Sequence, residues 1–362
     1  MSDRIHNFGA GPGVLPESVL KQAQQDIWNI GGSGIGIAEH SHRGKVFEKI
    51  ITEAEEEVRR LAEIPDRYKV LFIQGGATQQ FAMVPMNLLP QGRIADYLIT
   101  GVWAQKAHQE ANKFGTTHVA VSGEGSRFTA IPAASEIRYS ANPAYVHMTT
   151  NNTIHGTQWK EEPAVPDGVP LVADTSSDMF SRPIDITKYG LVYAGAQKNL
   201  GPSGIVLVIV REDLTESAPG GLPTMLQYRT YVKDRSLHNT PPTFAIYMVG
   251  LVLKWIRACG GLAAMADRNA SKAKILYDFL DQSELFAGSV DRDSRSLMNV
   301  CFRCPTEELD AKFVREAAAK GLDGLKGHRS AGGMRASLYN ACPRGSAEAL
   351  VAFMQEFERT NR

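Results

Sequence analysis

One lysine, Lys198, stands in a run of small residues between two short apolar segments. The run Ala194-Gly-Ala-Gln-Lys-Asn-Leu-Gly-Pro-Ser-Gly204 lies between 191–193 and 205–210. Because its neighbours are small, the lysine can point into a cleft, where desolvation lowers the pKa of its amine and makes it a nucleophile. A solvated lysine in a loop is the commoner arrangement, and Lys198 alone leaves both alternatives open.

A carboxylate, Asp174, ends the apolar segment Val169-Pro-Leu-Val-Ala-Asp174. The carboxyl ends of strands line the ligand crevice in a doubly wound sheet, so we expect Asp174 and Lys198 to meet there. Pyridoxal phosphate needs such a pair: a lysine that holds it as a Schiff base, and a carboxylate that keeps its pyridine nitrogen protonated. An aspartate that only caps the following turn is the alternative.

Two further features suit the same cofactor. The segment Gln74-Gly-Gly-Ala-Thr-Gln-Gln80 joins a predicted strand to a predicted helix, where free N–H groups and the helix dipole favour a phosphate. It matches neither a Walker loop nor a dinucleotide fingerprint, and an ordinary strand-to-helix turn looks similar. Trp103 follows another predicted strand end, where an indole can stack on a pyridine ring, although most tryptophans are core residues.

No metal site is expected. Cys301 and Cys304 form a single Cys-x-x-Cys, and no second pair or suitably spaced histidine completes a zinc site. His40 and His42 likewise lack a partner carboxylate or cysteine. We therefore expect the four cysteines to be reduced structural residues.

Short apolar segments alternate with helical patterns over the first 258 residues. They predict strands at 69–73, 98–100, 145–149, 171–173, 191–193 and 205–210. Helical spacing predicts helices at 17–28, 45–62, 79–88 and 243–257. This alternation is typical of an α/β fold with a mostly parallel sheet covered on both faces.

The pattern changes after Gly260-Gly261. Helices are predicted at 262–284, 307–320 and 346–359, and strands at 296–304 and 334–339. We expect a large domain at 16–258 and a small α+β C-terminal domain at 259–362, with the N-terminal segment 1–15 packed near the small one.

The composition and charge of the chain limit the classes of binding partner that we expect. The 362 residues are 43% hydrophobic and 22% charged, as in ordinary globular proteins. Lys plus Arg equals Asp plus Glu at 39 each, which argues against a nucleic-acid or anionic membrane surface. Residues 1–12 carry no signal-peptide pattern, and the apolar run 205–210 is too short to span a bilayer. We expect a cytoplasmic protein.

Together these motifs resemble the phosphoserine aminotransferase family, within the class V pyridoxal-phosphate-dependent aminotransferases. Further motifs carry the resemblance: Asn7-Phe-Gly-Ala-Gly-Pro12, Ser41-His-Arg-Gly-Lys45, His238-Asn-Thr-Pro-Pro-Thr243 and Gly327-His-Arg-Ser-Ala-Gly-Gly-Met-Arg335. They follow the family's order from residue 7 to 340. The resemblance implies fold type I of these transferases: a mostly parallel seven-stranded sheet flanked by helices, with a smaller α+β C-terminal domain.

The resemblance also implies how the cofactor is bound. It makes Lys198 the Schiff-base lysine, Asp174 the partner of the pyridine nitrogen and Trp103 the stacking residue. Thr153 is expected near the phenolic oxygen of the cofactor. The phosphate is expected to contact Ala77, Thr78 and Gln197, and also Asn239 and Thr240 of the other subunit. The family's site therefore implies a homodimer with shared active sites.

The implied reaction aminates 3-phosphohydroxypyruvate with L-glutamate, giving O-phospho-L-serine and 2-oxoglutarate in L-serine biosynthesis. Arg335 matches the α-carboxylate ligand, because a planar fork suits a carboxylate. The group that receives the phosphate or the distal carboxylate matches His42, Arg43, His328 and Arg329. Some members also form 4-phosphohydroxy-L-threonine for pyridoxine biosynthesis, and the sequence leaves this second role open.

Other functions share this fold. An alanine–glyoxylate type aminotransferase is the nearest alternative, whereas a cysteine desulfurase needs a mobile nucleophilic cysteine that no loop supplies. A non-catalytic nucleotide-binding protein would use the same doubly wound sheet. Two departures from the family pattern affect substrate contacts: Ala10 stands where serine is usual, and Thr78 stands where some relatives carry arginine.

Overall fold

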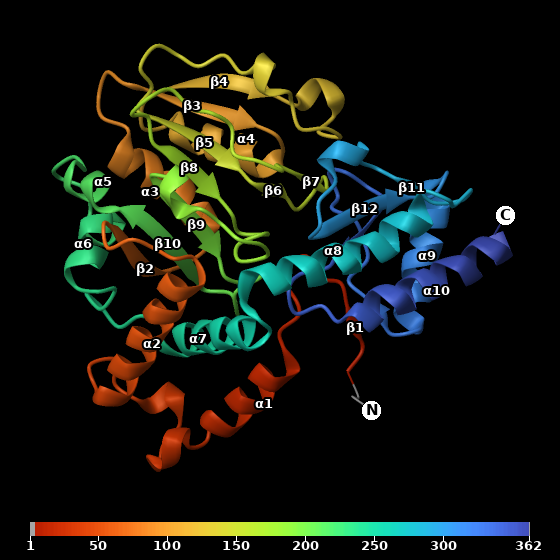
Figure 1. The fold of residues 1–362 in the computed structure, drawn as a ribbon, viewed down its shortest axis with the longest axis horizontal. Coiled ribbons are helices and arrows are strands. Elements are labelled where there is room, and N and C mark those ends of the chain that lie inside the picture. Colours follow the sequence, from red (N-terminus) through yellow and green to blue (C-terminus); the bar gives the residue numbers. More distant parts are fainter. Residues whose placement is uncertain (1–3, 362) are drawn as a thin grey trace.

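The computed structural model describes residues 4–361. Residues 1–3 of the predicted N-terminal segment, and residue 362, lie outside the described residues. Two bodies are visible, one built on a large sheet and one on a small sheet, and α8 (Gly261–Leu280) runs between them (Figure 1).

The large sheet has seven strands in the order β2-β10-β9-β8-β5-β3-β4. Their bounds are Tyr68–Gln74 (β2), Ile94–Ile99 (β3), Thr116–Ser122 (β4), Tyr145–Thr149 (β5), Leu171–Asp174 (β8), Leu191–Gly195 (β9) and Ile205–Arg211 (β10). Strand β10 is antiparallel to both β2 and β9, and the other neighbours are parallel. The predicted mostly parallel, seven-stranded sheet is confirmed.

Helices cover both faces of this sheet. One face packs against α2 (Lys45–Leu61) and α7 (Thr243–Ala258), with α1 (Glu17–Asp26) outside α7. The other face packs against α3 (Ala77–Leu88), α4 (Val102–Ala111) and α6 (Tyr228–Lys233), and the short α5 (Glu212–Glu216) follows β10. Both faces are therefore withdrawn from water, as expected for a mostly parallel sheet.

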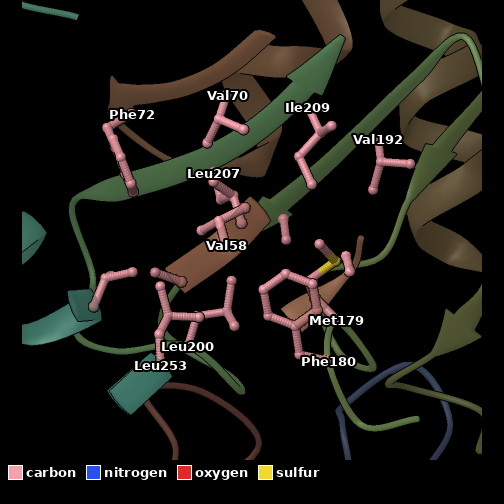
Figure 2. Packing of buried hydrophobic residues seen from close by; sticks show 14 of the residues in the cluster. Val58, Val70, Phe72, Met179, Phe180, Val192, Leu200, Leu207, Ile209 and Leu253 are labelled. Atoms are coloured by element: carbon pink, nitrogen blue, oxygen red, sulfur yellow. The ribbon is translucent and has the colours of Figure 1, made fainter. Parts of the chain in front are cut away.

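Side chains alternate between the two faces of the sheet along a strand, so one strand contributes to the hydrophobic core on each face. In β2, Val70 and Phe72 belong to the core under α2 and α7, whereas Leu71 and Ile73 belong to the core under α3. Figure 2 shows side chains of β2 and β10 on the first face, packed toward Val58 of α2. Burial of each such side chain contributes about 1.5–3 kcal/mol.

The small body combines three helices with short strands. Its sheet has the order β11-β12-β14, with bounds Ala287–Gly288, Asn299–Arg303 and Met334–Ser337, all antiparallel. Helices α8, α9 (Glu307–Ala319) and α10 (Arg344–Asn361) share its core. Thr306 begins α9 by accepting a hydrogen bond from the Leu309 amide.

The start of the chain joins this small body. Strand β1 (His6–Asn7) pairs in parallel with β13 (Leu322–Asp323), and Phe8 is fully buried in the small body's core. The domain limits 16–258 and 259–362 stay a prediction.

Several predicted elements have different ends. The helix expected at 17–28 ends at Asp26, the one at 262–284 ends at Leu280, and the strand at 296–304 spans only Asn299–Arg303. Strand β3 begins at Ile94 instead of residue 98, and β4 was not predicted. Within the described residues, no single helix is long and apolar enough to cross a membrane; α7 and α8 meet that length and composition only as a pair bent by 83°.

Candidate active site

Lys198 lies at the carboxyl end of the large sheet, in the turn between β9 and β10. Its Nζ donates a 2.7 Å hydrogen bond to Thr153 Oγ1, in the loop between β6 (Asn151–Asn152) and β7 (Thr157–Gln158). The same Nζ lies 5.6 Å from the ring centre of Trp103, in the first turn of α4. Asp174 ends β8, beside β9. The structure therefore brings these four predicted residues together.

The surroundings of Lys198 favour its neutral amine. The pKa of Lys198 is lowered to about 8: burial is the largest cause, Asp174 opposes it, and the Arg335 cation adds to the lowering. A lysine with a pKa close to neutrality has an appreciable free-amine fraction, which a nucleophile or general base requires.

Asp174 is a buried carboxylate that accepts hydrogen bonds from one neighbouring residue. It is 5% exposed, and its Oδ1 accepts hydrogen bonds from the Ser176 amide and hydroxyl, at 2.9 and 2.6 Å. Burial raises the pKa of Asp174, while Lys198 and Ser176 act in the opposite direction. A cationic N–H placed at this carboxylate would offset its desolvation.

An anion cradle forms where α3 begins. Gly75 has φ of +109°, a conformation that glycine adopts at little cost, and it lets the chain turn from β2 into α3. A Cβ at Gly195 would lie 2.9 Å from Gln197 Oε1 and 3.5 Å from the Ala77 nitrogen, so these two groups border the same small space. The first N–H groups of α3, at Ala77 and Thr78, have no partner within the helix. The arrangement suits a phosphate.

Asn239 lies next to this cradle within its own chain. Its Nδ2 donates a 3.0 Å hydrogen bond to Oε1 of Gln74, the last residue of β2. Thr240 is exposed. The predicted contact of Asn239 and Thr240 with the cofactor phosphate of another subunit stays a prediction.

A cavity of about 620 Å³ has Arg335 in its wall, and the charge of Arg335 acts on Lys198. Arg335 Nη1 donates to the Thr153 carbonyl at 3.0 Å, while Arg335 Nε is buried without a partner. His328 lies close by: burial lowers its pKa first, followed by the positive charges of Arg335, Arg329 and Lys106. This concentration of positive charge suits a polyanionic ligand.

His42 and Arg43 lie elsewhere, just before α2. Arg43 Nε donates to His42 Nε2 at 3.3 Å. Within residues 4–361, no hydrogen bond or ion pair joins either residue to His328, Arg329 or Arg335. Neither residue lines the cavity or is among the charges that act on Lys198 and His328, whereas Arg335 and Arg329 are among the charges that act on His328.

Sequence reasoning missed several residues of the cavity. Arg127, His155, Cys301 and Arg303 line it together with Arg335. They come from separate loops and from β12, and no shared motif or spacing marks them. The only signal was that Cys301, Arg303 and Arg335 fall on two predicted strands, whose pairing the sequence did not give.

The cysteines are free thiols in the structure. Cys301 lines the cavity, but burial raises the pKa of its thiol to about 12, so it stays protonated at neutral pH. It also lies within strand β12 rather than on a loop. A desulfurase needs a mobile thiolate, and Cys301 does not fit that description. Among the residues described, no cluster of three metal-ligating side chains occurs.

Known proteins resemble this chain along its whole length. A family model described as aminotransferase class V matches residues 5–350. A phosphoserine aminotransferase of Desulfosudis oleivorans is 54% identical over 363 residues, covering 100% of both chains. The solved phosphoserine aminotransferase of Bacillus circulans subsp. alkalophilus is 53% identical, with a TM-score of 0.98 and full coverage of both chains. A pyridoxal-phosphate-bound phosphoserine aminotransferase of Trichomonas vaginalis is 38% identical, with a TM-score of 0.93 over 97% of this chain and 100% of that one.

The chain therefore belongs to the class V aminotransferases and is a pyridoxal-phosphate-dependent transaminase. Within that class it belongs to the phosphoserine aminotransferase family. The predicted family, fold class, enzyme class and cofactor are confirmed, and the non-catalytic nucleotide-binding alternative is excluded.

The residues present fit pyridoxal phosphate. Asp174 is a buried carboxylate with a raised pKa, which a protonated pyridine nitrogen would satisfy. The indole nitrogen of Trp103 is buried without a partner beside Lys198. A Cβ at Gly76 would meet no atom within 4 Å, so the cradle has open space next to the Ala77 amide.

Proposed function

We propose that the protein transfers the amino group of L-glutamate to 3-phosphohydroxypyruvate, yielding O-phospho-L-serine and 2-oxoglutarate, in L-serine biosynthesis. The observation that carries this proposal is Lys198, whose pKa is lowered to about 8 and which feels the charges of Asp174 and of Arg335, one of three arginines that line the cavity. Both proposed substrates are polyanions. Full-length identity of 54% to a phosphoserine aminotransferase supports the same reaction.

In this proposal the described residues divide the work of cofactor binding. Lys198 Nζ would hold the cofactor covalently, Asp174 would pair with its pyridine nitrogen, and Thr153 would donate to its phenolic oxygen. Trp103 would stack on its ring. The phosphate takes its donors from the set Ala77, Thr78 and Gln197, with Asn239 and Thr240 of a second subunit. Pyridoxal phosphate supplies an electron sink for the substrate carbanion.

Lys198 also moves the proton. With the cofactor bound, Lys198 Nζ, as a free amine, would take the proton from the substrate α-carbon. A general base works best with a pKa near the operating pH, and a value of about 8 meets that condition. In the second half of the cycle the same Nζ returns a proton to the α-carbon of the product. Asp174, as a carboxylate, would keep the pyridine nitrogen of the bound cofactor protonated.

Substrate binding in the proposal depends on positive charge. Arg335 binds the α-carboxylate through its guanidinium fork, next to Thr153. His328 and Arg329 receive the phosphate or the distal carboxylate, and His42 and Arg43 complete this group. We further propose a homodimer with shared active sites, because the assigned cofactor and substrate contacts are not all gathered within one chain. We also propose that the protein is cytoplasmic.

One assay tests the reaction. Turnover of 3-phosphohydroxypyruvate with L-glutamate is compared with turnover of hydroxypyruvate, which lacks the phosphate. We expect at least about a hundredfold preference in kcat/KM for the phosphorylated acid, since one charged contact contributes about 1.5–3 kcal/mol and a phosphate makes more than one. Equal rates would favour an alanine–glyoxylate type enzyme, and absence of glutamate-dependent turnover would reject the proposal.

A further inference from the structure

The N-terminal segment at residues 9–13 lies directly against the turn that carries Lys198. The Gly13 amide donates a 2.7 Å hydrogen bond to the Gln197 carbonyl. A Cβ at Gly11 would lie 3.5 Å from Lys198 Cγ, and a Cβ at Gly13 would lie 3.0 Å from the Lys198 carbonyl oxygen. The backbone of the segment therefore forms one wall around the aliphatic stem of the lysine and shields part of it from water.

Tyr339 of the small body holds this segment in two places. Its hydroxyl donates a 2.6 Å hydrogen bond to the Ala10 carbonyl. Its ring borders Gly13, where a Cβ would lie 2.7 Å from Tyr339 Cδ2. The side chain is fully buried, and burial raises the pKa of Tyr339 to about 12. The hydroxyl thus keeps its proton at neutral pH and remains a donor to the segment.

Tyr339 is also connected to the opposite side of Lys198. Asn299 Nδ2 contacts the Tyr339 hydroxyl at 3.4 Å, and Asn299 Oδ1 accepts a 2.8 Å hydrogen bond from Asn151 Nδ2. Asn151 comes two residues before Thr153, whose Oγ1 accepts from Lys198 Nζ. A chain of buried side chains therefore joins the two segments that flank the lysine, and its central members belong to the small body.

We propose that Tyr339 is a positioning residue for Lys198. Its hydroxyl holds residues 9–13 against the lysine, and its contact with Asn299 fixes this wall relative to the Thr153 loop. Tyr339 acts through these segments, because no hydrogen bond within residues 4–361 joins its side chain to Lys198. The inference rests on the role of Lys198 in the proposed function and adds a residue of the other body on which that role depends.

The wall affects the protonation of Lys198. Burial is the largest cause of its lowered pKa, and the charges that act on it are Asp174, Arg335 and Asp178. Loss of the Tyr339 hydroxyl removes none of these charges. A looser wall admits water to the amine and weakens the effect of burial, so the pKa should rise from about 8 toward its ordinary value of 10.5.

Tyr339→Phe tests this role, because it keeps the ring and removes only the hydroxyl. Full-length protein without cofactor is labelled with a limiting amount of acetic anhydride over a range of pH, and peptide mass spectrometry gives the pKa of the Lys198 amine. We expect this pKa to rise by about 0.5–1, equivalent to the loss of one hydrogen bond. In the holoenzyme, kcat should fall about 3- to 10-fold for the same reason.

A matched tyrosine variant separates positioning from folding. Tyr68→Phe removes the hydroxyl of another buried tyrosine, which donates to the Tyr189 carbonyl at 2.7 Å. Tyr68 begins β2, at the opposite end of that strand from the anion cradle. Both phenylalanine variants should lower the free energy of unfolding by similar amounts. Only Tyr339→Phe should move the pKa of Lys198 and lower kcat.

A second variant reaches the same contact from the N-terminal segment. Gly13→Ala displaces the segment from Tyr339 and from the Lys198 turn, and it should raise the same pKa. Gly190→Ala is its control, because a Cβ there would lie 2.5 Å from Pro170 Cβ, at the end of β9 away from Lys198. This control should lower stability without changing the pKa of Lys198.

The outcomes distinguish positioning from a merely structural role and from the reaction itself. If Tyr339→Phe loses stability but keeps the pKa of Lys198 and kcat, the inference is overturned. Equal changes of that pKa in Tyr339→Phe and Tyr68→Phe would also overturn it, because they would show general loosening. If Tyr339→Phe does not fold, an unchanged pKa in Gly13→Ala rejects the inference. If the wild type does not convert glutamate although the pKa responds to Tyr339→Phe, the proposed function fails and the positioning role stands.

Discussion

The backbone amide of Asn340 donates a 3.0 Å hydrogen bond to the side-chain oxygen of Asn199, the residue after Lys198. Asn199 in turn donates to the Ser177 carbonyl at 3.1 Å. The Lys198 turn of the large body is therefore held by a buried loop that follows β14 of the small body. The position of Lys198 depends on both bodies, and the residues that fix this loop affect the site without touching it.

Lys272 is the first such residue. Its amine, 3% exposed, donates to the carbonyls of Leu338, Tyr339 and Asn340 at 3.0, 2.7 and 3.5 Å. Lys272→Met should lower the free energy of unfolding by about 2–4 kcal/mol, because buried carbonyls lose their donor. Lys274→Met, which removes an exposed i,i+4 pair with Asp278 on the same helix, should cost less than about 0.5 kcal/mol. Denaturant unfolding of both variants checks this, and equal costs would contradict it.

Lys198→Ala should abolish turnover and leave the fold intact. The change removes the amine that binds the cofactor and moves the α-proton, so we expect a loss of at least about a thousandfold in kcat. It also removes one hydrogen bond to Thr153, worth about 1 kcal/mol, so the melting temperature should change little. Turnover and circular dichroism are measured together. An unchanged transamination rate in the folded variant would sink the assignment.

Covalent uptake of pyridoxal phosphate by the cofactor-free protein should depend on the pKa of Lys198. With a value of about 8, the free-amine fraction rises about tenfold per unit up to that pH and then levels off. Since the Arg335 cation lowers this pKa, Arg335→Met should move the midpoint to higher pH. The visible absorbance of the bound cofactor follows the rate. Arg315→Met, which removes an exposed arginine of α9, serves as the control. A midpoint that Arg335→Met leaves in place would contradict the role of Arg335.

Asp174→Asn should stabilise the cofactor-free protein while it damages the enzyme. Burial raises the folded-state pKa of Asp174 above its ordinary value of 3.8, so the folded protein holds this proton more tightly than the unfolded chain. As pH rises from the unfolded-state pKa past the higher folded-state pKa, ionisation of Asp174 lowers the free energy of unfolding. Asparagine cannot ionise, so the variant avoids this loss. The variant should melt higher than the wild type at neutral pH, with the difference shrinking toward acid. Turnover with cofactor should fall at least about a hundredfold.

The proposed shared site can be tested by mixing inactive subunits. Lys198→Ala is combined with a variant carrying Asn239→Ala and Thr240→Ala, under conditions that exchange subunits. If Asn239 and Thr240 act in the second subunit, random mixed dimers regain one intact site, or about a quarter of wild-type activity overall. If they act within their own chain, mixing restores nothing. Light scattering establishes whether a dimer forms at all.

The sequence predicted best where local patterns are strong. Lys198 was located because β9 and β10 are short apolar segments on either side of a glycine-rich turn. Strand β3 was predicted only in its second half, because Asp96 interrupts the apolar pattern, although it is fully buried and accepts from the Ser140 amide at 2.8 Å. Strand β4 escaped prediction because it is a sheet edge, where polar and exposed residues are tolerated.

The cavity could not be predicted in the same way. Arg127 comes from the loop after β4, while Arg303 and Arg335 come from paired strands of the small body. These residues come close together only when the two bodies pack against each other. Their spacing along the chain therefore does not indicate that they are neighbours. The motif resemblance supplied Arg335, because it lies inside a recognisable segment. It could not supply Arg127 or Arg303, which lie outside every quoted motif.

The pairing of β1 with β13 has a consequence for the order of assembly during synthesis. His6 leaves the ribosome about 316 positions before its partner Leu322, an interval of roughly 15 seconds to one minute at 5–20 residues per second. The strands of the large sheet all lie between residues 68 and 211, so that body can form while translation continues. The first strand to be made is thus among the last to pair, and the small body closes only near release of the chain.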